Sequence, residues 1–307
     1  MTLGRRTLLK GMAVVGAAGA ASALPTEASA SERPHVKGDD VGMLYDTTLC
    51  IGCRACVTKC KEANDLPANR SADGIYDAPE RLDGTTKNVI QVAQLGGDKW
   101  SFMKAQCMHC ADPACVSVCM AGALHRTAGG IVAYEASTCV GCRYCQVGCP
   151  FDVPKFEWSK ALPRIVKCEL CRHRADPKKT GALAVANPAC CEACPREAVV
   201  FGTMSQLKGV AKARQAAHPE RYAAKVYGEH DGGGTHVLYL TAKDVTFEAL
   251  GLPELGDESP AAPAEHVQHG MYKWFALPTL LYGTLAYTIV KNKKKQAAHG
   301  GHHGEET

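Results

Sequence analysis

The chain has 307 residues, of which 17 are cysteine and only 6% are aromatic. A chain of this length can bury a core, but its scarcity of large apolar side chains indicates that something besides packing helps to hold it together. The net charge of +4 lies at the ends, because residues 1–30 and 291–307 each carry a net +2, and the near-neutral remainder excludes a general basic field for nucleic acid.

The first 30 residues have the pattern of an export leader. Arg5 and Arg6 precede a weakly apolar run of small residues, which ends in the A-x-A cleavage pattern of residues 28–30. The paired arginines predict a twin-arginine (Tat) signal peptide over 1–30. The alternative, an N-terminal membrane anchor, is disfavoured by the weak hydrophobicity of the run and by the cleavage pattern.

Short β-rich segments bracket the cysteines of the predicted body, residues 31–255. The predicted strands are 42–46, 88–93, 130–134, 198–202 and 235–240. Residues 205–222 are predicted to form an amphipathic helix that ends near Pro219. The glycines at 232–234 lack the strand-before, helix-after context of a nucleotide loop and predict a turn. The repeated order of strand, cysteine loop, short helix and strand predicts an α+β fold of ferredoxin-like units.

Four groups account for all but one of the cysteines. The first and third groups share the spacing C-x2-C-x2-C-x3-C, the second has two extra residues in its middle gap, and the fourth contains a long insertion. The groups are Cys50, Cys53, Cys56, Cys60; Cys107, Cys110, Cys115, Cys119; Cys139, Cys142, Cys145, Cys149; and Cys168, Cys171, Cys190 or Cys191, Cys194.

Clustered cysteines have three other common uses. Disulfides are disfavoured, because clustered thiols would have to pair at long range in many competing ways, and a Tat substrate folds before export in a reducing compartment. Zinc fits the fourth group, where two C-x2-C pairs would form a two-knuckle site. A c-type haem requires C-x-x-C-H, and no C-x-x-C pair here is followed by histidine.

The bacterial ferredoxin run, C-x2-C-x2-C-x3-C-P, explains the groups best. In such a run three cysteines bind one [4Fe–4S] cluster and the fourth binds a neighbouring cluster. Gly52 and Gly141 stand just before the second cysteine of their groups, where glycine permits a sharp turn that brings backbone N–H groups towards sulfur. Four such runs predict four [4Fe–4S] clusters.

The same rule selects a ligand from the adjacent pair Cys190-Cys191. The last two cysteines of the other groups are separated by three residues, which selects Cys190 with Cys194 and leaves Cys191 spare. A zinc site would select Cys191 instead.

The order of the groups then predicts which cysteines share a cluster. The two middle groups form an inserted two-cluster unit at about 104–163, and the outer groups pair across it to form an outer unit at about 31–103 and 164–255. The predicted ligand sets are Cys50, Cys53, Cys56 and Cys194 for cluster 1; Cys168, Cys171, Cys190 and Cys60 for cluster 2; Cys107, Cys110, Cys115 and Cys149 for cluster 3; and Cys139, Cys142, Cys145 and Cys119 for cluster 4.

Oxidised clusters with four thiolates are anionic, so nearby cations are candidates for setting their potentials. Arg54, Lys59, Arg143 and Lys167 are such candidates, and surface solubility is the competing explanation for each. His109, between Cys107 and Cys110, is a candidate proton or metal ligand, although a residue that shields a cluster is the favoured interpretation.

The C-terminal part resembles a membrane anchor. Residues 256–270 are a predicted linker rich in proline, alanine and acidic residues. Residues 271–290 are a predicted transmembrane helix, with a buried core helix as the alternative because the uncharged stretch 275–290 is short for a span. Four lysines begin the tail 291–307 and predict a cytoplasmic tail, which places the body on the outer, periplasmic side of the inner membrane.

The stretches "GMLYDTTLCIGCRACVTKC", "CMHCADPACVSVC" and "GCRYCQVGCPFDVPKFEW", followed by "KCELC" and "YGEHDGGGTHVLYLT", resemble a known family. They are similar to four-cluster ferredoxin-type subunits of membrane oxidoreductases, above all those of hydrogenase-2-type (Hyb) [NiFe]-hydrogenases. The resemblance implies electron transfer between the small and large subunits of a periplasmic [NiFe]-hydrogenase and an integral membrane, quinone-reactive subunit.

Two other functions stay open at this point. The cysteine pattern is shared with the beta subunits of formate dehydrogenases and other molybdopterin oxidoreductases. A membrane-anchored structural metal-binding protein is a further alternative. No nucleophile elbow, Walker loop or paired-acid arrangement stands out, so the chain is predicted to have no catalytic activity of its own.

Overall fold

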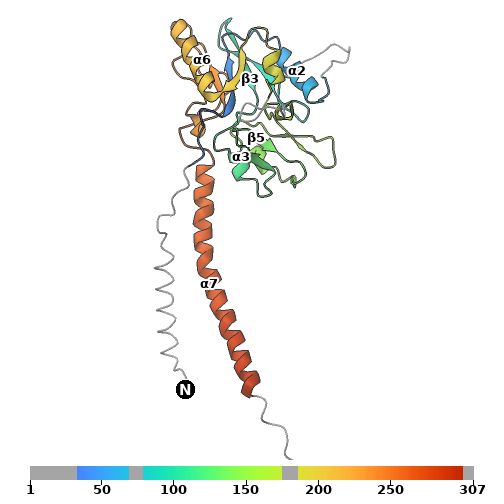
Figure 1. Ribbon diagram of the computed structural model, residues 1–307, viewed down its shortest axis with the longest axis vertical. Coiled ribbons are helices and arrows are strands. Elements are labelled where there is room, and N and C mark those ends of the chain that lie inside the picture. Colours follow the sequence, from blue (N-terminus) through green and yellow to red (C-terminus); the bar gives the residue numbers. More distant parts are fainter. Residues whose placement is uncertain (1–32, 69–78, 175–185, 300–307) are drawn as a thin grey trace, which may run out of the picture. The chain divides into compact units, whose positions relative to one another are not determined.

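The computed structural model describes residues 33–68, 79–174 and 186–299. The predicted Tat leader at 1–30 therefore lies outside the described residues, as does the end of the predicted tail. Figure 1 shows the described elements as coloured ribbons. They form a mixed arrangement of short strands and helices, followed by one long helix.

A three-stranded sheet in the order β8-β1-β9 organises the body. Its strands are β1 (Val41–Asp46), β8 (Val199–Thr203) and β9 (Val237–Leu240). The central strand β1 is antiparallel to β8 and parallel to β9, and all six of its residues are buried. Because successive side chains point to opposite faces, β1 contributes to two separate cores, Val41, Met43 and Tyr45 to one and Leu44 to the other.

The helix α6 (Met204–Ala217) covers the face of the sheet on which Leu44 lies. It starts with a capping box, in which the Thr203 hydroxyl accepts from the Gln206 N–H and the Gln206 side chain accepts from the Thr203 N–H. The prediction of a helix at 205–222 is confirmed, but the helix ends earlier, because the residue before Pro219 is disfavoured in helical conformation.

A buried carboxylate ties α6 to β1. Asp46 is 0% exposed, and it accepts hydrogen bonds from Arg214 Nη1 at 3.0 Å and from the Tyr222 hydroxyl at 2.8 Å. It also accepts from the backbone N–H and the hydroxyl of Thr48, at 2.9 and 2.7 Å. This carboxylate is thus paired and fully hydrogen-bonded, as a buried charge requires.

Three antiparallel hairpins complete the strands. They are β2 (Val89–Gln94) with β3 (Trp100–Ala105), β4 (Leu124–Arg126) with β5 (Val132–Tyr134), and β6 (Lys155–Phe156) with β7 (Ile165–Val166). All five predicted strands are confirmed, as β1, β2, β5, β8 and β9. The predicted turn at 232–234 overlaps η3 (Asp231–Gly233), a single turn of 3-10 helix.

Short helices carry the third cysteine of each group, and the first of these helices also carries Cys60. They are α2 (Ala55–Ala63), α3 (Ala114–Ser117), α4 (Tyr144–Val147) and α5 (Ala189–Glu192), and a 3-10 turn, η1 (Arg172–Arg174), follows Cys171. α2 packs with α5, and α3 packs with α4. The first and fourth groups are thus neighbours, as are the second and third, and the predicted α+β ferredoxin-type fold agrees with this pairing.

The C-terminal helix α7 (Ala262–His299) is longer than the predicted span (Figure 1). It begins inside the predicted linker, because Pro263 falls in the first turn, where proline removes no helical hydrogen bond. It continues past residue 290 because lysine and alanine are good helix formers. Within the described residues, no helix combines the length and the apolar character needed to cross a membrane.

Candidate iron–sulfur centres

One backbone conformation recurs in all four cysteine groups. The residue just before the second cysteine has a positive φ in each: +69° at Gly52, +48° at His109, +72° at Gly141 and +47° at Leu170. This left-handed conformation turns the chain sharply and is rare for residues other than glycine. The prediction from Gly52 and Gly141 is confirmed for their backbone, and His109 and Leu170 adopt the same turn without glycine.

The turn brings backbone N–H groups to sulfur. The Gly52 N–H donates to Cys50 Sγ at 3.4 Å, and the Leu170 N–H donates to Cys168 Sγ at 3.4 Å. Such N–H···S hydrogen bonds stabilise a thiolate and tune a cluster bound to it.

The four cysteines predicted for cluster 1 line a single cavity. Its other walls include Tyr45, Ile51, Ile90 and Val199, so the thiols face an apolar surface. Its cysteines are Cys50, Cys53, Cys56 and Cys194. Burial, followed by the neighbouring thiols, raises the pKa of Cys56 to about 12, although Lys104 opposes this shift. A metal must therefore displace a proton that the apolar site holds tightly.

The four cysteines predicted for cluster 4 line a second cavity, built on the inserted segment. Phe156 and Ile165 form part of its wall, and Met120 and Val140 lie at the same cavity. Its cysteines are Cys119, Cys139, Cys142 and Cys145. Burial is the main reason that the pKa of Cys145 rises to about 11, and the other three thiols add to the shift.

The thiols predicted for cluster 3 also lie together. Cys110 interacts electrostatically with Cys107, Cys115 and Cys149, and burial followed by these interactions raises its pKa well above the usual value. Burial likewise raises the pKa of Cys149 to about 11. Of these four residues, Cys107 and Cys115 are buried and the other two are partly exposed.

The thiols predicted for cluster 2 form the fourth set. Cys60 interacts with Cys190 and Cys171, and Cys168 interacts with Cys190 and Cys60. All four residues are buried, and burial is the largest cause that raises the pKa of Cys60 to about 11.

The adjacent thiols of Cys190 and Cys191 are hydrogen-bonded to each other. This hydrogen bond is the largest cause that lowers the pKa of Cys190 to about 6, and Lys104 also favours its thiolate. The pKa of Cys191 rises for the converse reason, since its thiol is the donor. Cys190 is 4% exposed and faces the cluster 2 set, whereas Cys191 is only partly buried. The arrangement favours Cys190 as the thiolate of the pair.

Neighbouring sets interact electrostatically in a fixed order. Cys56 of the first set interacts with Cys190 of the second, Cys168 of the second with Cys107 of the third, and Cys115 of the third with Cys145 of the fourth. The sets therefore follow one another as 1, 2, 3 and 4.

The predicted tuning cations differ in their surroundings. Arg54 lines the first cavity. Arg143 lines the second cavity, and its guanidinium lies 4.1 Å from the centre of the Trp158 ring. Lys167 is buried and donates to the backbone oxygens of Cys168, at 3.1 Å, and of Val132.

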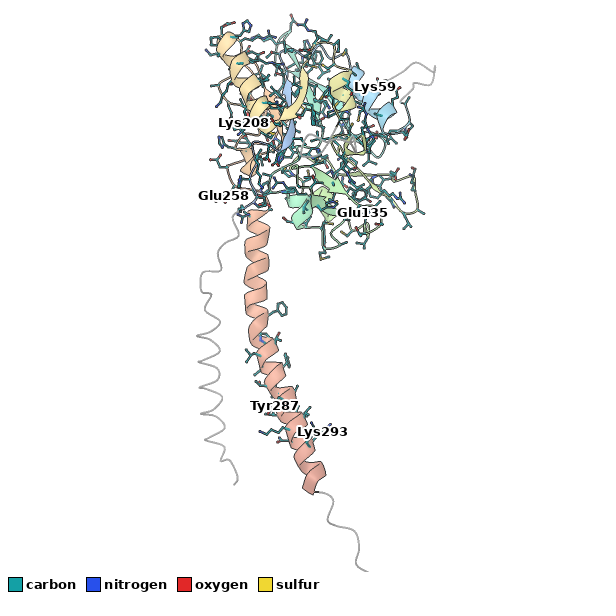
Figure 2. All side chains as sticks on the ribbon, viewed as in Figure 1. Lys59, Glu135, Lys208, Glu258, Tyr287 and Lys293 are labelled. Atoms are coloured by element: carbon teal, nitrogen blue, oxygen red, sulfur yellow. The ribbon has the colours of Figure 1, made fainter. Side chains whose placement is uncertain are left out.

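Lys59 has a different environment. Its side chain is 47% exposed and forms an ion pair with Glu62, and Figure 2 labels it on α2. This environment fits a surface residue and not a tuning cation.

Two buried residues complete the site. Lys104, a cation that the sequence analysis missed, is 0% exposed and interacts with four thiols of sets 1 and 2. His109 is also fully buried, and its Nδ1 accepts from the Val132 N–H at 3.0 Å. Burial, reinforced by Lys167 and His236, lowers the pKa of His109 well below its usual value, so its ring is neutral. Its Nε2 finds no partner among the described residues.

Comparison with known proteins agrees with this arrangement. Residues 49–123 and residues 98–204 each match a family described as a 4Fe-4S dicluster domain, and these ranges contain all four cysteine groups. The fold and the site therefore define a ferredoxin-type iron–sulfur protein. Two dicluster domains correspond to the predicted cofactor, four [4Fe–4S] clusters, and iron–sulfur electron transfer is the function of this class.

Full-length relatives narrow the class. The hydrogenase-2 operon protein HybA of Escherichia coli O157:H7 is 38% identical over 91% of this chain and 93% of its own length. A protein of Nitratidesulfovibrio vulgaris is 40% identical over 93% of this chain and 75% of its own length. The iron–sulfur subunit of the nitrate-inducible formate dehydrogenase of Escherichia coli K12 is 34% identical over 80% of this chain and 81% of its own length. The chain belongs to the HybA family, which confirms the resemblance found in the sequence.

Proposed function

We propose that this chain is the electron-transfer subunit of a membrane-bound, periplasm-facing [NiFe]-hydrogenase. It relays electrons between the catalytic small and large subunits and a quinone-reactive membrane subunit. The observation that carries this proposal is the series of four thiol sets, each interacting electrostatically with the next. Electron transfer across a protein requires several redox centres in sequence, whereas a structural metal site does not require a series of neighbouring sites.

The ligand sets follow the cavities and contacts described above. Cluster 1 is bound by Cys50, Cys53, Cys56 and Cys194; cluster 2 by Cys60, Cys168, Cys171 and Cys190; cluster 3 by Cys107, Cys110, Cys115 and Cys149; and cluster 4 by Cys119, Cys139, Cys142 and Cys145. The chain supplies no catalytic residue in this proposal. Its residues bind the clusters, turn the backbone around them and shield the inner ones from water.

The ends of the relay are the two clusters nearest the surface. Cys53 of cluster 1 and Cys142 of cluster 4 are exposed, whereas the ligands of cluster 2 are all buried. Electrons therefore enter and leave through clusters 1 and 4 and pass through clusters 2 and 3 in between.

The location of the chain follows from its two ends. A Tat leader at 1–30 exports the folded body. The stretch 271–290 anchors it in the inner membrane with the tail in the cytoplasm, although no helix of the described residues has the length and apolar character of a membrane span. Exposed apolar side chains on α7 support an apolar environment for this helix; they include Phe275, Leu280, Leu281, Leu285, Ile289 and Val290. Tyr287 and Lys293 also project from this helix (Figure 2), as expected near a membrane interface.

Purification of the full chain with its native partners tests the proposal. Iron and sulfide analysis with electron paramagnetic resonance (EPR) of the reduced complex is expected to give four [4Fe–4S] clusters on this subunit. Fewer than three clusters, or zinc without inorganic sulfide, would contradict an electron relay. The partner distinguishes the two oxidoreductases: hydrogenase subunits are expected, and a molybdopterin subunit would instead support the formate dehydrogenase alternative that the 34% identical relative represents.

A further inference from the structure

Lys104 is a buried cation in an unusual place. It lies on β3 with an exposed fraction of 0% and interacts electrostatically with thiols of both the cluster 1 set and the cluster 2 set. Its ammonium donates to the side-chain oxygen of Gln106. The Gln106 amide is oriented by its own N–H group, which donates to Met43 Sδ at 3.1 Å. Gln106 is neutral, and no carboxylate of the described residues forms an ion pair with Lys104.

A buried ammonium without a counter-ion is strongly unfavourable. The groups that supply negative charge around Lys104 are the sulfurs of Cys190, Cys56, Cys168 and Cys60. Cysteines that bind iron do so as thiolates, so their negative charge surrounds the ammonium when the clusters are bound.

We propose that Lys104 is the shared counter-ion of clusters 1 and 2, a positioning residue that raises the reduction potentials of both. The inference rests on the proposed cluster assignment. Reduction adds one negative charge to a cluster, and a fixed cation nearby favours the reduced form. Because the same ammonium interacts with Cys56 of one set and with three ligands of the other, it also offsets the repulsion between two neighbouring anions.

The effect is confined to the first half of the relay. Lys167, the other buried lysine of the site, donates to the backbone of Cys168 and acts on Cys115 of set 3. We therefore expect Lys104 to act mainly on clusters 1 and 2 and Lys167 to act on cluster 3.

The test is a redox titration, followed by EPR, of the full complex that carries Lys104→Met. Variants Cys53→Ser and Cys142→Ser identify the signals of clusters 1 and 4. Lys104→Met is expected to lower the ratio of reduced to oxidised cluster at a fixed potential by at least about tenfold for clusters 1 and 2, which is a shift of ~59 mV for one electron. Cluster 4 is expected to titrate as in the wild type.

Lys59→Met is the matched control, because Lys59 lies on the same helix as Cys56 and Cys60 but is exposed and paired with Glu62. It is expected to leave all four potentials unchanged. Unchanged potentials in Lys104→Met, or an equal shift of all four clusters, would overturn the inference. If the Lys104→Met complex binds less iron than the wild type, Lys104→Arg is the deciding variant, since it keeps the positive charge. Wild-type iron content and potentials in Lys104→Arg would support the inference, and their absence would contradict it. A wild-type complex without four clusters would instead contradict the proposed function.

Discussion

The substitution Gly52→Ala tests whether the turn in a cysteine loop holds the first cluster site in place. Gly52 has a φ of +69°, and a Cβ there would lie 2.4 Å from Phe102 Cε1 and 2.6 Å from Phe102 Cζ. The left-handed conformation costs an alanine about 1–2 kcal/mol, and displacement of the ring adds about 1–3 kcal/mol. The expected destabilisation is therefore about 2–5 kcal/mol.

Gly141→Ala is the matched control for this substitution. Gly141 occupies the same place in the third cysteine group, with a φ of +72°, but a Cβ there has nothing within 4 Å. Only the conformational cost of about 1–2 kcal/mol applies. The two glycines hold equivalent positions in their cysteine motifs, but only Gly52 lies against a neighbouring ring.

The assay is the rate at which visible iron–sulfur absorbance is lost in denaturant. The clash alone predicts that Gly52→Ala loses absorbance at least about fivefold faster than Gly141→Ala, since its lower bound of about 1 kcal/mol corresponds to a factor of about 5. In the background Phe102→Ala, which lacks the ring, the extra effect of Gly52→Ala is expected to disappear. Equal rates for Gly52→Ala and Gly141→Ala would refute the steric argument.

Four further substitutions, used in three experiments, test separate parts of the site and the fold. Cys190→Ser is expected to lose iron from one cluster while Cys191→Ser keeps the full iron content, and the opposite result in iron analysis would make Cys191 the ligand. Asp46→Ala leaves the largely buried Arg214 unpaired and is expected to cost about 3 kcal/mol, seen as a lower denaturation midpoint; an unchanged midpoint would show that this ion pair does not stabilise the fold. Phe156→Ala removes a ring that is 1% exposed at the wall of the second cavity, and a loss of about 3–5 kcal/mol is expected to accelerate loss of cluster 4, detected by EPR, before loss of cluster 1.

Much of the site could be predicted because the chemistry of iron dictates the sequence. A cluster needs several thiolates from one short loop, so the spacing of the cysteines shows which residues act together. The displaced fourth cysteine of each run then shows which loops must be neighbours, and α2 does pack with α5. The strands around the loops could be predicted because β-branched and aromatic residues favour pleated, half-buried surfaces.

Other features have no such signature. Leu170 adopts the turn that glycine adopts elsewhere, because its side chain is fully buried in the core, and tertiary packing outweighs a local preference. Lys104 stands within a strand, opposite Ile90 of β2 and outside any cysteine motif, and its interactions with two thiol sets arise from tertiary structure. The predicted C-terminal helix begins at residue 271, whereas α7 begins at Ala262. The helix includes part of the predicted linker because Pro263, at the start of a helix, does not terminate it.

Removal of the iron is expected to unfold the protein in parts. One core contains no cysteine and joins α6 to the sheet through Leu44, Met204, Leu207, Leu238 and Leu240, among others. The core of the inserted segment, by contrast, includes Cys115 and Cys145, and its strands are only two or three residues long. The free energy of metal binding contributes to folding. The core of the inserted segment therefore depends on its clusters far more than the core between α6 and the sheet does.

Hydrogen–deuterium exchange before and after chelation of the iron distinguishes these two regions. Backbone amides of α6 and β9 are expected to keep most of their protection, whereas those of β4 to β7 are expected to exchange as in an unfolded chain. Simultaneous loss of protection in α6 and in the hairpins would contradict this expectation and would make the body a single cooperative unit. Retained protection in both regions would also contradict it. That result would show that the apolar contacts of the inserted segment keep it folded without iron, even though its core includes the cluster ligands Cys115 and Cys145.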